Sequence, residues 1–139
     1  MSSENSSQII GSGYLGTLQG ICKIVEVVSS FVAVLLIAIN AYGWVISLFE
    51  AAAIISIIIS TFLLVIYLTG TVEKIPLSWN RFQFFFHIIL AVYYVIAVAL
   101  VFHYGGSIAR FIAGGVLGLI AIIAHLLDGY DNFRKQPLC

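Results

Sequence analysis

The sequence predicts an all-α integral membrane protein: a bundle of four transmembrane helices with both termini in the cytoplasm. The composition is the first reason, because 62% of the 139 residues are hydrophobic and only 9% are charged, whereas about a quarter of a soluble domain is charged. The second reason is that the apolar residues form four runs near the length of about 20 residues that a helix needs to cross the bilayer. The third is an uneven distribution of Lys and Arg between the two sides.

The four spans are predicted at about residues 24–41, 51–69, 82–102 and 108–127, within a single domain over residues 14–128. Met1 to Gly13 is rich in Ser, Asn and Gly, which predicts a short flexible tail, and residues 129–139 are a second tail. Residues 42–50 are predicted to form a tight hairpin at the membrane surface. The second span is rich in isoleucine, but helix is still expected, because lipid leaves no partner for unpaired backbone groups.

The basic residues near the span ends set the orientation. Arg110 alone falls on one side, and five basic residues fall on the other: Lys23, Lys74, Arg81, Arg134 and Lys135. Cytoplasmic loops carry the excess of Lys and Arg, so both termini are expected inside. Aromatic residues at four boundaries are of the type that lies at lipid headgroups, namely Tyr42, Trp44, Trp79 and Tyr104.

Glu26 is an acidic residue inside a predicted span, where a carboxylate costs about 2.5–3.5 kcal/mol at the centre of the bilayer. Lys23 lies three residues earlier on the same helix face. The favoured interpretation is a boundary ion pair between these two residues, with the Lys23 side chain reaching towards the headgroups.

Three other polar residues are predicted to lie in the same half of the bilayer as Lys23 and Glu26: His87, His125 and Asp128. Such an inner-leaflet cluster can relay protons, bind a metal through two imidazoles and a carboxylate, or respond to pH. Buried His and Glu residues of neighbouring helices more often hydrogen-bond to one another and fix the packing. Packing is therefore the favoured role, and the sequence assigns no metal and no cofactor.

Small residues form two stripes that permit close helix packing. Gly114 and Gly118 make a Gly-x-x-x-Gly pair in the fourth span, and the second span carries Ala52, Ser56 and Ser60. Contact within the bundle is the favoured interpretation, with contact to a second copy or another protein as the alternative. Cys22, at the predicted inner boundary, is a candidate for palmitoylation, with an unmodified thiol as the alternative.

Composition and motifs also exclude some classes of function. Six basic residues balance six acidic ones, so no basic excess indicates nucleic acid as a partner. The sequence contains no catalytic constellation of the kinds known for hydrolases or phosphate-binding enzymes, and no enzyme activity is expected.

Three segments resemble the MARVEL-domain tetraspan family, which includes the chemokine-like factor group, plasmolipin and the myelin and lymphocyte protein. They are YLGTLQGICKIVEVVSSFVAVLLIA before and in the first span, IPLSWNRFQF before the third, and GLIAIIAHLLDGYDNFRK at the end of the fourth. The resemblance covers nearly the whole chain. It implies a four-span fold in the plasma membrane or in endosomal or secretory vesicles.

The resemblance also implies a function without catalysis: organising membrane regions, vesicle traffic or cell contacts through association with lipids and membrane proteins, including other copies of the chain. Two alternatives remain. One is a small dimeric proton-coupled transporter with Glu26 as the coupling residue, although coupling sites usually lie nearer the bilayer midplane. The other is an accessory subunit of a larger membrane complex.

Overall fold

The computed structural model describes residues 10–39 and 43–135, and it contains four long helices. Each is long and apolar enough to cross a membrane, with mean hydropathies of 2.1–2.6, which confirms the predicted four-span helical bundle. The long helices are α1 (Leu18–Ala38), α2 (Trp44–Leu68), α3 (Trp79–Gly105) and α4 (Ala109–Lys135), and two short 3-10 helices are η2 (Gly11–Gly16) and η3 (Thr71–Lys74).

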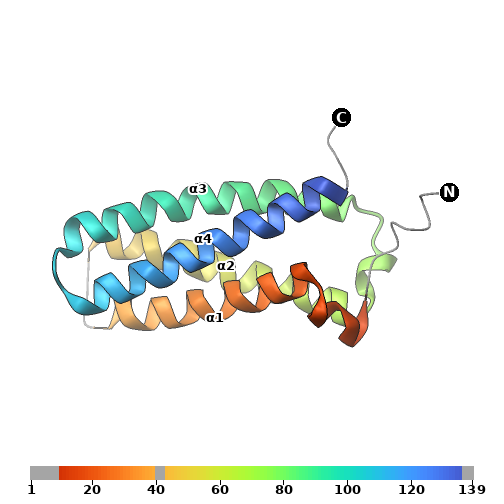
Figure 1. The fold of residues 1–139 in the computed structure, drawn as a ribbon, viewed down its shortest axis with the longest axis horizontal. Helices are drawn as coiled ribbons and strands as arrows, with labels where there is room; N and C mark the ends of the chain where they lie inside the picture. Colours follow the sequence, from red (N-terminus) through yellow and green to blue (C-terminus); the bar gives the residue numbers. More distant parts are fainter. Residues whose placement is uncertain (1–9, 40–42, 136–139) are drawn as a thin grey trace.

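The four helices run up and down alternately along one elongated bundle (Figure 1). Helix α4 packs against α1 and α3, and α2 packs against the same two helices. The start of α1, the end of α4 and both 3-10 helices lie at one end, which we call the η end. A chain with an even number of alternating spans has to begin and end at the same end of the bundle. The placement of the η end in the cytoplasm remains a prediction.

Helix α1 begins at Leu18 rather than at residue 24 as predicted. Thr17 caps it, because its side chain accepts a hydrogen bond from the backbone N–H of Gly20 at 3.1 Å, which satisfies one of the free donors of the first turn. The predicted tail also ends earlier than expected, since residues from Gly11 onward form η2. Tyr14 of η2 anchors this segment by stacking on Tyr67 of α2, with ring centroids 4.5 Å apart.

The predicted interfacial hairpin over residues 42–50 is wrong for most of its length. Helix α2 starts at Trp44, seven residues before the predicted span, because Val45 and Phe49 are buried in the core and extend its packed face. Gly43 precedes it with a φ of 138°, a conformation that favours glycine. Tyr42 lies outside the described residues.

The other two helices also extend beyond their predicted spans. Helix α3 begins at Trp79 instead of residue 82, and α4 runs from Ala109 to Lys135 instead of ending at residue 127. The first turns of the expected C-terminal tail are therefore helical, because Gly129, Asp131 and Asn132 are buried against α1 and α3.

Glycines of α4 let the helices approach closely in the half of the bundle away from the η end. A Cβ atom on Gly114 would lie 2.4 Å from Cγ1 of Ile37, and one on Gly118 would lie 2.6 Å from Cγ2 of Val98. Both glycines thus face α1 or α3 inside the bundle. Apolar side chains surround them, including Ala33, Phe49, Ala97 and Val101.

Replacing Gly118 with Ala is expected to lower the free energy of unfolding in detergent by about 1–3 kcal/mol, because Val98 and Phe49 leave no room for the methyl group. Gly129→Ala is the matched control in the same helix, since its Cβ would meet its nearest neighbour at an ordinary 3.4 Å. Thermal unfolding followed by circular dichroism measures both. Equal stability of the two variants would contradict the close packing at Gly118.

Candidate functional site

A fully buried ion pair joins the first and last helices near the η end. Lys23 of α1 donates to Oδ2 of Asp128 of α4, and both side chains are completely buried. The Lys23 ammonium also lies 3.2 Å from Nε2 of His87 on α3. The predicted Lys23–Glu26 boundary pair, with Lys23 reaching to the headgroups, is therefore wrong, because the lysine points into the bundle.

Glu26 lies one turn further along α1, and its two carboxylate oxygens have different surroundings. Oε2 accepts a hydrogen bond of 2.5 Å from the hydroxyl of Ser60 on α2. Oε1 has no hydrogen-bond partner among the described residues, but it lies 3.3 Å from Nδ1 of His125 and 3.6 Å from Nδ1 of His87. A buried carboxylate oxygen thus faces two imidazole nitrogens.

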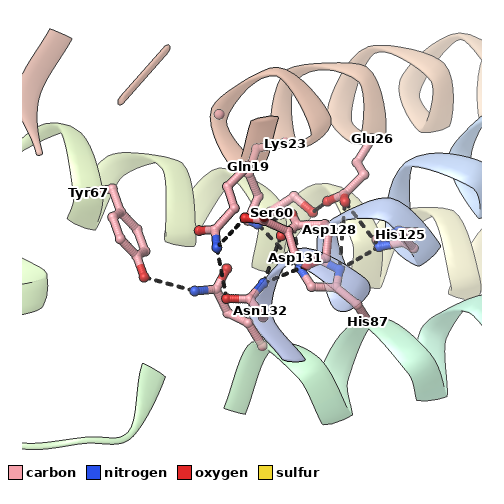
Figure 2. Close-up of polar contacts among 12 residues, drawn as sticks. Gln19, Lys23, Glu26, Ser60, Tyr67, His87, His125, Asp128, Asp131 and Asn132 are labelled. Atoms are coloured by element: carbon pink, nitrogen blue, oxygen red, sulfur yellow. Dashed lines mark hydrogen bonds and ion pairs between the residues drawn. The ribbon is translucent and has the colours of Figure 1, made fainter. Parts of the chain in front are cut away.

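The two imidazoles face each other through the same nitrogens, with their Nδ1 atoms 2.8 Å apart. Their other nitrogens are also occupied. Nε2 of His87 lies 3.2 Å from Oδ2 of Asp128, and Nε2 of His125 lies 2.9 Å from the hydroxyl of Ser56. Figure 2 shows Glu26, His87 and His125 converging from three different helices. We call these three residues the His–Glu triad.

Polar contacts continue from Asp128 to the η end of the bundle (Figure 2). The side-chain amide of Asn132 donates to Oδ1 of Asp128 at 2.9 Å. The amide of Gln19 donates to both Asn132 and Asp131. Asp131 in turn pairs with Arg134, whose side chain is largely exposed, and with Lys135, whose side chain is about half exposed. The chain of contacts therefore connects the buried charges to the helix end.

In the other direction the polar contacts stop near the middle of the bundle. The Ser30 hydroxyl donates to Ser56 at 3.3 Å and lies 2.6 Å from the hydroxyl of Tyr94. Beyond Tyr94, the buried side chains among the described residues are apolar. The half of the core near the η end thus contains the buried polar contacts beside a second apolar cluster around Tyr67, and the other half is apolar.

The structure brings together five residues named from the sequence, Lys23, Glu26, His87, His125 and Asp128, and adds several that the sequence analysis missed. The missed residues of these contacts are Gln19, Ser30, Tyr94, Asp131 and Asn132, and Gln83, also missed, is buried nearby with its amide donating to the Tyr67 hydroxyl. A signal for them was present, because polar residues recur at intervals of three, four or seven positions within the helices, and such spacing puts them on one face. On α1 this stripe runs through positions 19, 23, 26 and 30.

Other residues singled out in the sequence have varied environments. Ala52, Ser56 and Ser60 are fully buried on the inner face of α2, and Cys22 is only 4% exposed. Trp44 and Tyr104 are exposed and contact each other edge to face. Trp79 is not a lipid-facing anchor as predicted: it is buried, and its indole N–H donates to the backbone carbonyl of Val72, which holds η3 against α3.

The formal charges of this core do not balance when both imidazoles are neutral. Lys23 supplies one positive charge, whereas Glu26 and Asp128 supply two negative charges, and all three side chains are completely buried. An uncompensated charge is costly away from water. The core therefore favours holding one further proton or cation beside the acidic groups.

Removing Lys23 alone is expected to destabilise the protein strongly. Lys23→Met leaves Asp128 charged and without its cationic partner, which costs about 3–5 kcal/mol. The double variant Lys23→Met/Asp128→Leu is expected to recover most of this loss, because it removes both charges. Unfolding in a denaturing detergent series measures the differences.

Lys135→Met is the control for this comparison, because Lys135 is about half exposed in its pair with Asp131 and such pairs contribute under about 1 kcal/mol. A Lys23→Met variant as stable as Lys135→Met would show that the buried pair is not a major determinant of the fold.

Comparison with known proteins gives one relative. Over 123 residues the chain is 28% identical to human proteolipid protein 2, and the aligned part covers 87% of this chain and 77% of the relative. No protein-family model matches the chain, and no solved structure matches it. The similarity and the four apolar helices together support a tetraspan family related to that proteolipid protein. The chain is an integral membrane protein that crosses the bilayer four times.

Proposed function

We propose that this protein is a non-enzymatic tetraspan of the MARVEL type, which organises membrane regions through association with lipids and other membrane proteins. The three resembling segments and the similarity to proteolipid protein 2 support this proposal. The proposed setting is the plasma membrane or endosomal and secretory vesicles, where such association serves vesicle traffic or cell contact.

The distribution of polar and apolar side chains carries the proposal. The buried charges are held in contacts between helices, whereas large apolar side chains cover the outside of all four helices. Described residues outside the helices amount to short connections and η2 and η3. The membrane-embedded surface is therefore the main surface that the described chain offers to a partner.

One part of that surface is aromatic and bridges two helices. Phe84 of α3 contacts both Phe85 of α3 and Phe133 of α4, each with ring centroids 5.3 Å apart. Phe85 and Phe133 are both substantially exposed. We call these three residues the aromatic face. Rigid aromatic side chains supply large contact area at low entropic cost, so this face is our proposed contact for lipids and membrane proteins.

The apolar half of the core favours an organising role and argues against proton-coupled transport. A transporter needs a polar route that opens to each side in turn. The buried polar contacts instead reach from the η end only to Tyr94, where the described core becomes apolar. Glu26 contacts two histidines and a serine within the bundle, which supports a structural role for it in this conformation.

Substitutions in the aromatic face are expected to weaken association without unfolding the bundle. Energy transfer between donor- and acceptor-labelled full-length chains in liposomes measures self-association, and mass spectrometry after mild-detergent purification from native membranes identifies co-purifying lipids and proteins. Phe85→Ala/Phe133→Ala is expected to weaken the affected association by roughly thirtyfold or more, because each of the two anchor residues contributes about 1 kcal/mol or more.

Phe62→Ala is the matched control, since Phe62 is exposed to a similar degree on α2. It is expected to retain the wild-type associations. Wild-type chains that are randomly distributed in liposomes and that purify without specific lipids or proteins would overturn the proposed function. If the chain instead co-purifies with one set of larger proteins in a constant ratio, this result would support the alternative that it is an accessory subunit of a larger complex.

A flux measurement tests the transport alternative. The wild-type chain in liposomes under a proton gradient is expected to acidify the interior no faster than empty liposomes, because the apolar half of the core blocks proton passage. Glu26→Gln is expected to behave identically. Wild-type flux that disappears in Glu26→Gln would show coupling through this carboxylate and would contradict the organising role as the primary function.

A further inference from the structure

We propose that the His–Glu triad is a binding site for a divalent transition-metal ion of the zinc type, with Oε1 of Glu26, Nδ1 of His87 and Nδ1 of His125 as ligand atoms. The three atoms all lie within 4.8 Å of one another and all three side chains are buried. This inference is independent of the proposed function and revises the expectation from the sequence, which assigned no metal.

The distances between the three atoms fit one face of a tetrahedral coordination shell. Ligand atoms at about 2.0–2.1 Å from Zn²⁺ in tetrahedral geometry stand about 3.3 Å from one another. The observed separations are 2.8 Å between the two Nδ1 atoms, and 3.3 Å and 3.6 Å from these atoms to Oε1. To receive the ion, the two Nδ1 atoms have to move apart by about 0.5 Å, and Nδ1 of His87 has to move about 0.3 Å closer to Oε1.

The missing hydrogen bond at Oε1 of Glu26 is a second observation that points to a ligand. Its side chain is completely buried, yet Oε1 has no hydrogen-bond partner among the described residues. A buried acceptor without a partner costs free energy. This atom is aimed at the two Nδ1 atoms, which is where the metal would bind.

Each proposed ligand residue also contacts a neighbouring side chain through the nitrogen or oxygen that would not bind the metal. In metal sites the second nitrogen of a ligating histidine usually donates to a carboxylate or another oxygen. His87 has Asp128 at this position, and His125 has Ser56. The second oxygen of Glu26 accepts from Ser60. These contacts orient the two imidazoles so that their Nδ1 atoms face each other, and the metal ion would replace the present contact between these two atoms.

The choice of metal follows from the ligand types and from charge. Imidazole nitrogens suit Zn, Cu, Fe and Ni, whereas Mg²⁺ and Ca²⁺ prefer oxygen ligands. A divalent cation changes the formal charge of the buried groups from −1 to +1, and deprotonation of a water molecule bound to it would bring this charge to zero. Three protein ligands leave one tetrahedral position for a water molecule or another small ligand. Lys23, the nearby cation, is already held by Asp128.

The test uses the full-length chain in detergent, purified with a tag that contains no histidine. The protein is loaded with Zn²⁺, passed through a desalting column and analysed for metal by mass spectrometry. Wild type is expected to retain one equivalent of zinc, and loading with Co²⁺ is expected to give the visible absorption of a tetrahedral site. A wild-type chain that retains neither metal would overturn the proposal.

Variants assign the ligands. Glu26→Gln and His125→Asn are expected to lose the retained metal, and Ser60→Ala is expected to bind it about 10–100-fold more weakly. His103→Asn is the matched control, because His103 is exposed outside the triad and its loss is expected to leave the zinc content unchanged. Equal loss of zinc in His103→Asn and His125→Asn would overturn the assignment.

Circular dichroism and gel filtration establish that each variant is folded. If a ligand variant fails to fold, X-ray absorption at the zinc edge of the wild-type protein decides the matter. Two imidazoles and an oxygen ligand support the triad, whereas sulfur ligation or a fully hydrated ion would exclude it.

Discussion

The buried pair between Lys23 and Asp128 is the interaction on which the rest of this bundle depends. A lysine that is completely buried inside a helix bundle has to find a negative partner in place of water. Lys23 pairs with Asp128, and this pairing sets the register of α1 against α4. With these two helices aligned, His125 comes level with Glu26, and His87 of α3 completes the contacts.

Close packing in the other half of the molecule supports this alignment. Ile37 and Val98 occupy the space that side chains on Gly114 and Gly118 would fill, so α4 lies near both α1 and α3 along its length. Lipid provides little hydrophobic drive for helices to associate, and tight packing and interhelical hydrogen bonds take its place. In this bundle the interhelical polar contacts lie near the η end, and the close packing at glycines lies in the other half.

The sequence predicts the architecture well and the contacts less well, for a physical reason. Hydropathy is a property of each segment by itself, so the four spans follow from runs of apolar residues. The choice of partner for Lys23 is not local: Glu26 is three residues away and Asp128 is 105 residues away, yet the structure joins the lysine to the distant aspartate. The helix ends were missed similarly, because Val45 and Asn132 extend their helices through tertiary burial.

The separation of Lys23 from Asp128 along the chain also has a consequence for biogenesis. Ribosomes add about 5–20 residues per second, so the aspartate is made on the order of 5–20 s after the lysine. During that interval α1 carries a lysine and a glutamate whose partners in α4 have not been synthesised. The contacts that hold α1 against α4 can therefore form only after the last helix has been made, so the final placement of α1 is coupled to completion of the chain.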